Sequence, residues 1–252
     1  MIIVGGKAVL ARPDAAQIMN LLHKISEDNE VVTKHWHGFN VLHQNPGRIA
    51  ALDIGVYPEN KGMDTSGIKK ALKNGKIDVL VLYGDPDIPV SEVKNAGKII
   101  YIGTNQSAYA DQADVVLPAA AYTEKTALWT NTEGRIQEGH KAVPAPMQAK
   151  EDWKIFRALS EQIANPLPFD TQAQLREELI KTSPCFAHVG QVPLTAWQQF
   201  GLAGKILDEP FTKPIELFYK NNEIMRASQV MTECQDLANA RKESETQQKK
   251  AG

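Results

Sequence analysis

Residues 77–84 read IDVLVLYG, an apolar run that is interrupted only by Asp78 and ends on Gly84. Two similar runs follow it along the chain, KIIYIGT at 98–104 and DVVLP at 114–118. Short and nearly continuous apolar runs are typical of strands that are covered on both faces, as in parallel sheets. These three runs predict the centre of an open, mostly parallel α/β sheet.

The residues before this stretch alternate in the same way. Apolar runs predict strands at 2–6 (IIVGG) and 31–33 (VVT). Apolar spacing of about 3.6 residues predicts helices at 14–24, near 39–51 and at 65–73. Helices between apolar strands indicate parallel crossover connections, so the fold class is α/β.

In an open α/β sheet, ligands bind in the crevice beyond the carboxyl ends of the strands. That edge is expected at Gly84–Pro89 and Gly103–Ser107. VGGKAV follows a strand but lacks GxGxxG, and no GxxxxGK[ST] occurs. In VLYGDPD the strand-end glycine precedes two acids, which fit a tight turn and would repel a phosphate. A free-standing nucleotide-binding protein remains an alternative, and nucleotide titration would test it.

The pattern changes after Pro118. LWTNTEG and RIQEGHKAV predict short strands or extended arms that turn at Glu133 and Gly134. Helices are predicted at 151–163 and 171–181, with Thr171 as the N-cap of the second. Residues 215–237 predict a final amphipathic helix. The polar residues after it predict a frayed end.

These patterns predict four regions. They are an incomplete α/β sheet domain at 1–125 that a partner chain completes, an extended arm or hairpin plus a helix at 126–165, a helical and proline-rich docking extension at 166–240, and a disordered tail at 241–252.

Composition narrows the class of protein. The chain has 252 residues, of which 42% are hydrophobic and 23% charged, and a formal net charge of −2. Phosphate binding needs an excess of Lys and Arg, so we expect no nucleic-acid partner. No apolar run reaches the roughly 18 residues that a membrane-spanning helix needs. MIIVGGKAVL predicts a buried strand from residue 2, so we expect either a removed presequence or a chain that begins inside a larger architecture.

The candidate metal ligands are few. Cys185 and Cys234 are the two cysteines, whereas an iron–sulfur cluster normally takes four thiolates and a structural zinc site four close ligands. A disulfide between them stays open, and a reduced compartment is the simpler interpretation. His35, His37 and His43 in HWHGFNVLH are at metal-ligand spacing, but no acid or thiol lies beside them. Packing and surface roles are the default for these histidines.

The segment 117–137, LPAAAYTEKTALWTNTEGRIQ, resembles an active site because charged residues follow a buried strand. Acid–base catalysis would need Glu124 or Glu133 in a closed pocket. The simpler interpretation is that Glu124, Lys125, Glu133 and Arg135 satisfy one another and the backbone of the turn.

The same segment resembles a known signature. DVVLPAAAYTEKTALWTNTEGRIQ at 114–137 is similar to the signature of the molybdopterin oxidoreductase superfamily, and most similar to its complex I branch, the 75 kDa iron–sulfur subunits. HGFNVLHQNPGRIAALDIGVYP, EDWKIFRALSEQI, LPFDTQAQLREEL and FYKNNEIMRASQVMTEC match that branch in the same order. His37 stands where the branch commonly has Asn, and Ala127-Leu128 replace a small Gly-Thr pair.

The resemblance implies a scaffold that has kept its fold and lost its cofactor. The superfamily's molybdenum ligand and C-terminal cofactor-binding barrel are not evident, and the chain resembles about the last third of the subunit. No catalytic, cofactor-binding or metal residue is therefore expected. The resemblance implies a structural role for the signature residues Pro118, Tyr122, Glu124, Asn131, Glu133, Gly134 and Arg135.

The resemblance also implies partners and a place. The expected role is a non-catalytic structural part of the peripheral arm of respiratory complex I, packed against the chain that carries the iron–sulfur N-terminal half. The docking surfaces are expected at Asn222–Leu237 and Gln191–Pro214. The expected location is the matrix side of the mitochondrial inner membrane. The alternative is an accessory part of a molybdopterin oxidoreductase such as a formate dehydrogenase, which molybdenum in the assembly would favour.

Overall fold

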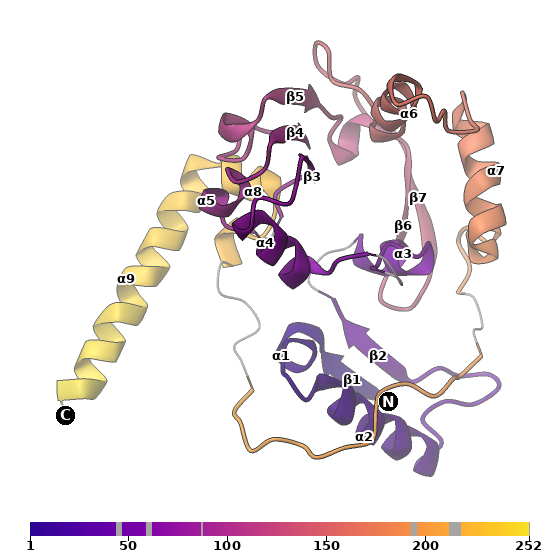
Figure 1. Cartoon of the computed structure of the whole chain (residues 1–252). Coiled ribbons are helices and arrows are strands. Elements are labelled where there is room, and N and C mark those ends of the chain that lie inside the picture. Colours follow the sequence, from indigo (N-terminus) through magenta and orange to yellow (C-terminus); the bar gives the residue numbers. More distant parts are fainter. Residues whose placement is uncertain (44–46, 59–61, 87, 193–195, 212–217, 252) are drawn as a thin grey trace. The chain divides into compact units, whose positions relative to one another are not determined.

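The computed structural model describes residues 1–43, 47–58, 62–86, 88–192, 196–211 and 218–251 (Figure 1). The chain divides into two compact units, and each is assembled from three separate segments. The first unit comprises Met1–Val56, Ala127–Gly139 and Thr171–Glu216, and the second comprises Tyr57–Thr126, His140–Asp170 and Leu217–Gly252. The predicted regions 1–125, 126–165 and 166–240 follow the chain instead, so their boundaries differ from those of the units.

The second unit contains the predicted parallel sheet. Strands β3 (Val79–Tyr83), β4 (Lys98–Gly103) and β5 (Val115–Pro118) pair in parallel in the order β3-β4-β5. Helix α4 (Thr65–Lys73) precedes β3, and the short helix α5 (Val90–Val93) connects β3 to β4. All three strand predictions and the helix at 65–73 are confirmed. Asp64 caps α4 by accepting a 2.7 Å hydrogen bond from the Gly67 N–H.

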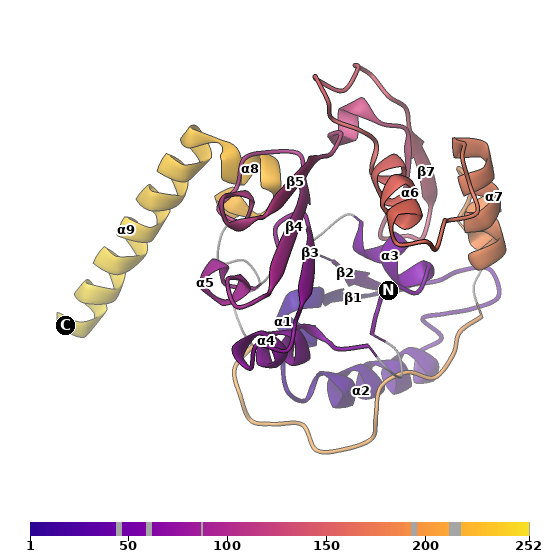
Figure 2. The same ribbon diagram turned by 45° about the horizontal axis from the view of Figure 1, so that its top comes forward.

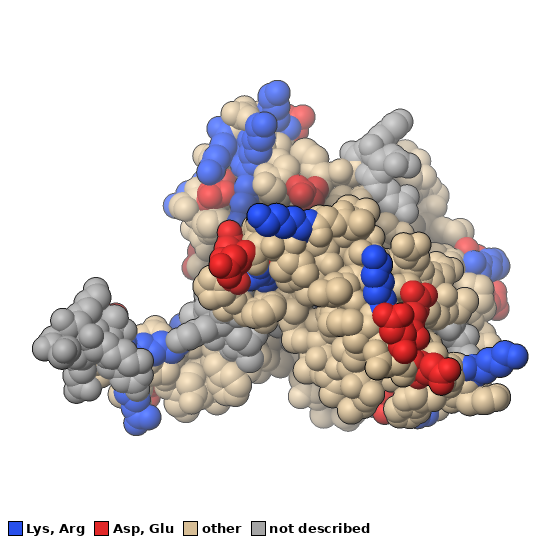
Figure 3. Space-filling model, turned by 90° about the horizontal axis from the view of Figure 1, so that it is seen from below, with Lys and Arg blue, Asp and Glu red and all other residues tan. Residues whose placement is uncertain are grey.

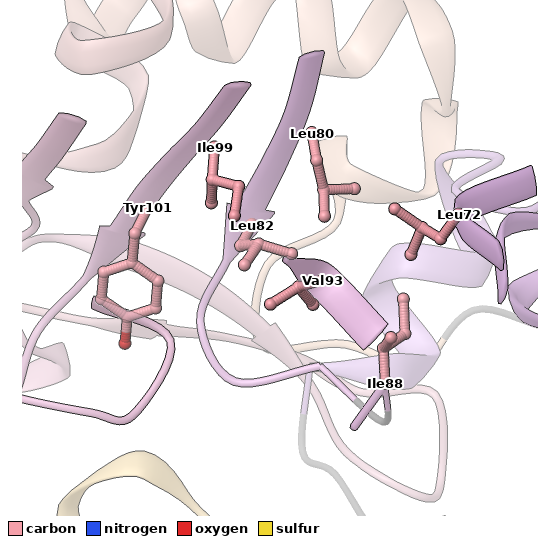
Figure 4. Close-up of a cluster of buried hydrophobic side chains, with 7 residues drawn as sticks. All are labelled: Leu72, Leu80, Leu82, Ile88, Val93, Ile99 and Tyr101. Atoms are coloured by element: carbon pink, nitrogen blue, oxygen red, sulfur yellow. The ribbon is translucent and has the colours of Figure 1, made fainter. Parts of the chain in front are cut away.

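The main core of this unit lies on one face of the sheet (Figure 4). Leu80 and Leu82 of β3 are buried there with Ile99 and Tyr101 of β4 and with Leu72, Ile88 and Val93. Helix α6 (Asp152–Gln162) contributes Ile155 to a second cluster, with Ile102 and Ala119. The other face of β3 is largely open, because Val79, Val81 and Tyr83 are 56%, 48% and 56% exposed, although the Tyr83 ring also packs against Phe156 of α6 at 5.7 Å. The prediction that the strands are covered on both faces is therefore wrong for β3.

The first unit contains a smaller sheet. Strand β1 (Ile2–Gly5) pairs in parallel with β2 (Phe39–Leu42), and helices α1 (Gly6–Leu10) and α2 (Ala15–Asp28) follow β1. The strand at 2–6 and the helix at 14–24 are thus confirmed. The helix predicted near 39–51 is wrong, because this segment begins with β2 and becomes helical only in α3 (Arg48–Asp53). The strand predicted at 31–33 is reduced to an isolated bridge between Val32 and His37.

The first unit also holds the predicted hairpin. Strands β6 (Ala127–Thr130) and β7 (Ile136–Gly139) pair in an antiparallel ladder. Helix α7 (Gln172–Thr182) and the 3₁₀ turn η3 (Pro184–Ala187) complete this part of the unit. Thr171 caps α7 as predicted, since its Oγ1 accepts from Gln174 N–H at 3.2 Å and the Gln174 side chain accepts from Thr171 N–H.

The C-terminal segment differs most from its prediction. It forms the turn η4 (Phe218–Lys220), helix α8 (Glu223–Ala227) and helix α9 (Gln229–Ala251), with residues 215–217 outside the described part. One helix was predicted over 215–237, and Ser228 interrupts it with an extended backbone. Helix α9 continues to Ala251 and so includes most of the tail, residues 241–252, that was expected to be disordered. Figures 1 and 2 show α9 leading away from the sheet of its own unit.

Candidate functional site

The first half of the signature shapes the turn that follows β5. Glu124 lies at the end of the 3₁₀ turn η2 (Tyr122–Glu124), and its Oε2 accepts a 2.9 Å hydrogen bond from the Ala121 N–H. Lys125 forms an ion pair with Asp152, and both side chains are more than four-fifths buried. This pair ties the turn to the start of α6. Lys125 was expected to pair within the signature, and its partner Asp152 escaped the sequence analysis.

The second half of the signature closes the β6–β7 hairpin. The Asn131 side-chain Oδ1 accepts from the N–H groups of Glu133 and Arg135, each at 3.0 Å. Gly134 has a φ of +81°, a left-handed conformation that glycine adopts without strain. Its N–H also donates to the Asn131 carbonyl oxygen at 2.9 Å. Asn131 and Gly134 are therefore turn-forming residues.

Arg135 and Glu133 contact each other as predicted. The Arg135 Nε lies 3.4 Å from the Glu133 Oε2, and the two side chains are 40% and 61% exposed. An exposed pair of this kind contributes little to stability. Arg135 Nη1 also donates a 2.7 Å hydrogen bond to the carbonyl oxygen of Gly190, which ties the hairpin to the segment after η3.

The signature residues do not form one site within either unit. Glu124 belongs to the second unit, whereas Asn131, Glu133 and Arg135 belong to the first. Each is engaged with nearby backbone or with a neighbouring side chain. Tyr122 is 60% exposed. The geometry assigns these residues to turns.

The histidines expected to be packing or surface groups divide between those roles. His35 is exposed, and His43 is half-buried, with its pKa lowered by burial and by the nearby charge of Arg48. His37 packs edge-on against Trp197, with ring centroids 5.4 Å apart. Within the described part of the chain, no group of three or more His, Cys, Asp or Glu residues is placed to hold a metal ion.

An aromatic cluster around Trp197 escaped the sequence analysis. His23 of α2 stacks on the Trp197 ring at 5.0 Å with an interplanar angle of 9°. Phe39 and Phe200 contact the same indole at 5.4 Å and 5.1 Å. The cluster fixes the segment around residue 200 on the first unit. Trp197 and Phe200 lie more than 150 residues from His23 and Phe39 in sequence, so no local pattern reveals the cluster.

The expected ligand crevice, beyond β3 and β4, is occupied by the chain itself. Thr104 follows β4, and its Oγ1 donates to the carboxylate Oε2 of Glu223 in α8 at 2.8 Å. The Thr104 N–H points to the same oxygen at 3.4 Å. Gly84 follows β3 with a φ of +68°, and a Cβ there would lie 2.2 Å from Glu223 Oε1. The carboxylate therefore fills the space between the two strand ends.

A second contact lies beside the first. Arg226 of α8 forms an ion pair with Asp85 at 3.3 Å, and the Asp85 side chain is 4% exposed. Tyr101 of β4 donates to the other Asp85 oxygen at 3.1 Å. Burial raises the pKa of Tyr101 to about 12, so this phenol stays a hydrogen-bond donor through the physiological range. The crevice follows the predicted strand ends, whereas its occupant, Glu223, lies 119 residues further along the chain than Thr104.

Two family models match this chain. The family model for molybdopterin oxidoreductases matches residues 1–162. A second family model, for the C-terminal region of an NADH-ubiquinone oxidoreductase subunit, matches residues 192–234. The first match covers more than half of the chain. The chain belongs to the molybdopterin oxidoreductase family.

The relatives that the chain resembles belong to one branch of that family. The chain is 33% identical to the NADH-ubiquinone oxidoreductase 75 kDa subunit of Reclinomonas americana, over 94% of this chain and 34% of the relative. It is 33% identical to the mitochondrial NADH dehydrogenase [ubiquinone] iron-sulfur protein 1 of Solanum tuberosum, over 94% of this chain and 31% of that protein. It is 32% identical to an NADH-quinone oxidoreductase subunit of Rickettsia conorii, over 96% of this chain and 34% of that subunit.

The resemblance read from the signature is thereby confirmed. The chain is similar to the C-terminal part of the complex I 75 kDa subunit, and it spans about one third of the length of these relatives.

Proposed function

We propose that this chain is a non-catalytic, structural part of the peripheral arm of an NADH:ubiquinone oxidoreductase. The relatives are subunits of such complexes, and the chain corresponds to one third of their length. In this proposal it packs against the part of the 75 kDa subunit that carries the iron–sulfur clusters, on the matrix side of the mitochondrial inner membrane. The described part of the chain contains no helix long and apolar enough to cross a bilayer.

The observation that carries the proposal is the open face of β3. Val79, Val81 and Tyr83 form a strip of exposed apolar side chains, which we call the β3 strip. Strands of parallel sheets are normally covered on both faces. β3 also lies at the edge of its sheet, with backbone groups on one side that are unpaired within the sheet. Such a surface is stabilised when another polypeptide covers it.

Other exposed apolar side chains supply a wider contact area. Val230 and Leu237 of α9 are 61% and 64% exposed. Figure 3 shows one face of the molecule, where large uncharged areas separate scattered side chains of both charges. The expected docking surface at Asn222–Leu237 is retained for α9, whereas Glu223 and Arg226 of α8 are engaged within the second unit.

The proline-rich segment is attached to the first unit through its backbone. Of the proposed surface at Gln191–Pro214, residues 193–195 and 212–214 lie outside the described part. Leu207 N–H donates to Asp14 at 2.8 Å, and the Arg12 side chain donates to the carbonyl oxygens of Leu207 and Pro210. Backbone groups of this segment are therefore used to fasten it to the first unit.

The cofactor assignment follows from the thiols. Cys185 lies in the first unit and Cys234 in the second, and both are free. A cluster normally takes four thiolates. We therefore place the iron–sulfur clusters in the partner and no cofactor in this chain.

The test separates solubilised membranes on a native gel, blots for this chain and stains the gel for NADH dehydrogenase activity. We expect the chain in the active high-mass band. A band without NADH activity would refute the proposal. Molybdenum in that band would support the alternative, an accessory part of a molybdopterin oxidoreductase such as a formate dehydrogenase.

A matched pair of variants tests the β3 strip itself. Val81 and Val143 are both 48% exposed, but only Val81 lies in the sheet. We expect Val81→Glu to deplete the chain from the active band and Val143→Glu to leave it there. Circular dichroism of both variants would confirm folding. Equal incorporation of the two variants into the active band would show that the β3 strip is not part of the interface.

A further inference from the structure

The family's cofactor does not fit the crevice beyond β3 and β4. Molybdopterin carries a phosphate, and open α/β sheets bind such ligands beyond the carboxyl ends of their strands. In this chain a carboxylate already accepts the Thr104 hydroxyl hydrogen bond, with its other oxygen against Gly84. A second anion there would be repelled by the Glu223 carboxylate, whereas the charge of the buried Asp85 is paired with Arg226.

We propose that the crevice is an anion-binding position whose resident anion is the chain's own Glu223. The donors are those that would hold a phosphate oxygen, namely a backbone N–H and a hydroxyl at Thr104. A glycine at position 84 leaves room for the carboxylate, since any side chain there would collide with Glu223 Oε1. Helix α8 thus acts as a built-in ligand that closes the crevice against phosphate-bearing molecules.

The contacts beside Glu223 explain why the helix stays in place. Arg226 is one turn further along α8 and pairs with Asp85, while its Nη1 also donates to the Asp85 carbonyl oxygen at 3.3 Å. Its Nε donates to the Lys220 carbonyl oxygen at 3.0 Å, which joins η4 to α8. Asn222 caps α8 through a 2.9 Å hydrogen bond from the Met225 N–H. Two oppositely charged attachments, three residues apart, therefore orient α8 on the strand ends.

This inference is independent of the proposed function, because every group in it belongs to the second unit of this chain. A chain that fails to enter complex I could still have a closed crevice. A chain that enters it could still bind phosphate.

The test compares hydrogen exchange at residues 84 and 104 in the full chain and in Glu223→Ala, with and without pyrophosphate. Loss of a charge-assisted hydrogen bond should speed exchange at the Thr104 amide roughly tenfold. Pyrophosphate should slow that exchange in Glu223→Ala and leave the unaltered chain unchanged. Glu233→Ala, on the exposed side of α9, is the matched control and should behave as the unaltered chain.

Three results would overturn the inference. Unchanged exchange in Glu223→Ala would show that the carboxylate does not hold the crevice. Protection of the unaltered chain by pyrophosphate would show that the crevice is open. Failure of pyrophosphate to protect Glu223→Ala would show that the position is no anion site. Glu223→Gln keeps the shape of the side chain, and should show faster Thr104 exchange without pyrophosphate binding even if the alanine variant misfolds.

Discussion

Thr171 shows how far a single residue can be predicted from its neighbours. A capping box depends on residues three positions apart, and here Thr171 and Gln174 satisfy each other's N–H groups as expected. His37, in HWHGFNVLH, illustrates the opposite case. Nothing local indicates that His37 packs on Trp197, which is distant in sequence.

Replacing Thr171 by Ala should destabilise the chain by about 1 kcal/mol, because an N-cap hydrogen bond is lost at the start of α7. Urea unfolding followed by circular dichroism measures this change. Thr171→Ser retains the hydroxyl and should differ little from the unaltered chain. A loss as large for Ser as for Ala would contradict the capping role.

The hydrogen bonds of Asp14 make the stability of the folded chain depend on pH. Its carboxylate accepts two hydrogen bonds from Arg12, at 2.8 and 2.9 Å, and these lower the pKa of Asp14 from 3.8 to about 2. A carboxylate whose pKa is lowered on folding stabilises the folded state when the pH is above its ordinary pKa. That contribution is lost as the pH falls from about 4 to about 2.

The unfolding temperature of the unaltered chain should therefore fall over this pH range more steeply than that of Asp14→Asn. A thermal scan across pH 2 to 7 makes the comparison. Parallel curves for the two proteins would mean that Asp14 does not carry the effect.

At the scale of elements, strand β3 is the informative case. Its run of apolar residues led to the expectation of two covered faces, yet only Leu80 and Leu82 are buried. A valine on an open face and one in a core read alike in sequence. The helix predicted near 39–51 failed for a related reason, because pairing with β1 draws Phe39–Leu42 into a strand against the local helical spacing.

Substitutions of neighbouring residues in β3 should therefore change the free energy of unfolding by very different amounts. Leu82 is 3% exposed in the main core, so Leu82→Ala should cost about 2–5 kcal/mol of unfolding free energy. Val81→Ala, on the open face, should cost less than about 1 kcal/mol in the full chain. Chemical unfolding of both variants tests this contrast, and similar losses would place both side chains in a core.

At the scale of the whole molecule, the two units interleave along the chain. Residues 171–216 complete the first unit, and residues 217–252 belong to the second. A C-terminal truncation therefore affects both units, although sequence order alone would suggest that it removes only an extension.

Ending the chain at residue 170 should expose apolar surface in both units. It removes Trp197 and Phe200 from their contacts with Phe39, and it removes the Glu223 contact with Thr104. We expect increased binding of a hydrophobic dye and aggregation on size-exclusion chromatography. Ending the chain at residue 240 leaves these contacts in place and serves as the control. A monomeric, dye-negative 1–170 fragment would contradict the interleaved arrangement.

The sequence by itself determined the strands of the β3-β4-β5 sheet, the helices α2, α4, α6 and α7, the cap at Thr171, the hairpin turn and membership of the family. These features depend on periodicity and on hydrogen bonds between residues a few positions apart. Tertiary structure alone decided which face of β3 is open, which segments share a unit, and that Glu223 fills the crevice beside Thr104, 119 residues away. Such contacts depend on where distant segments meet in three dimensions, and no local spacing records that.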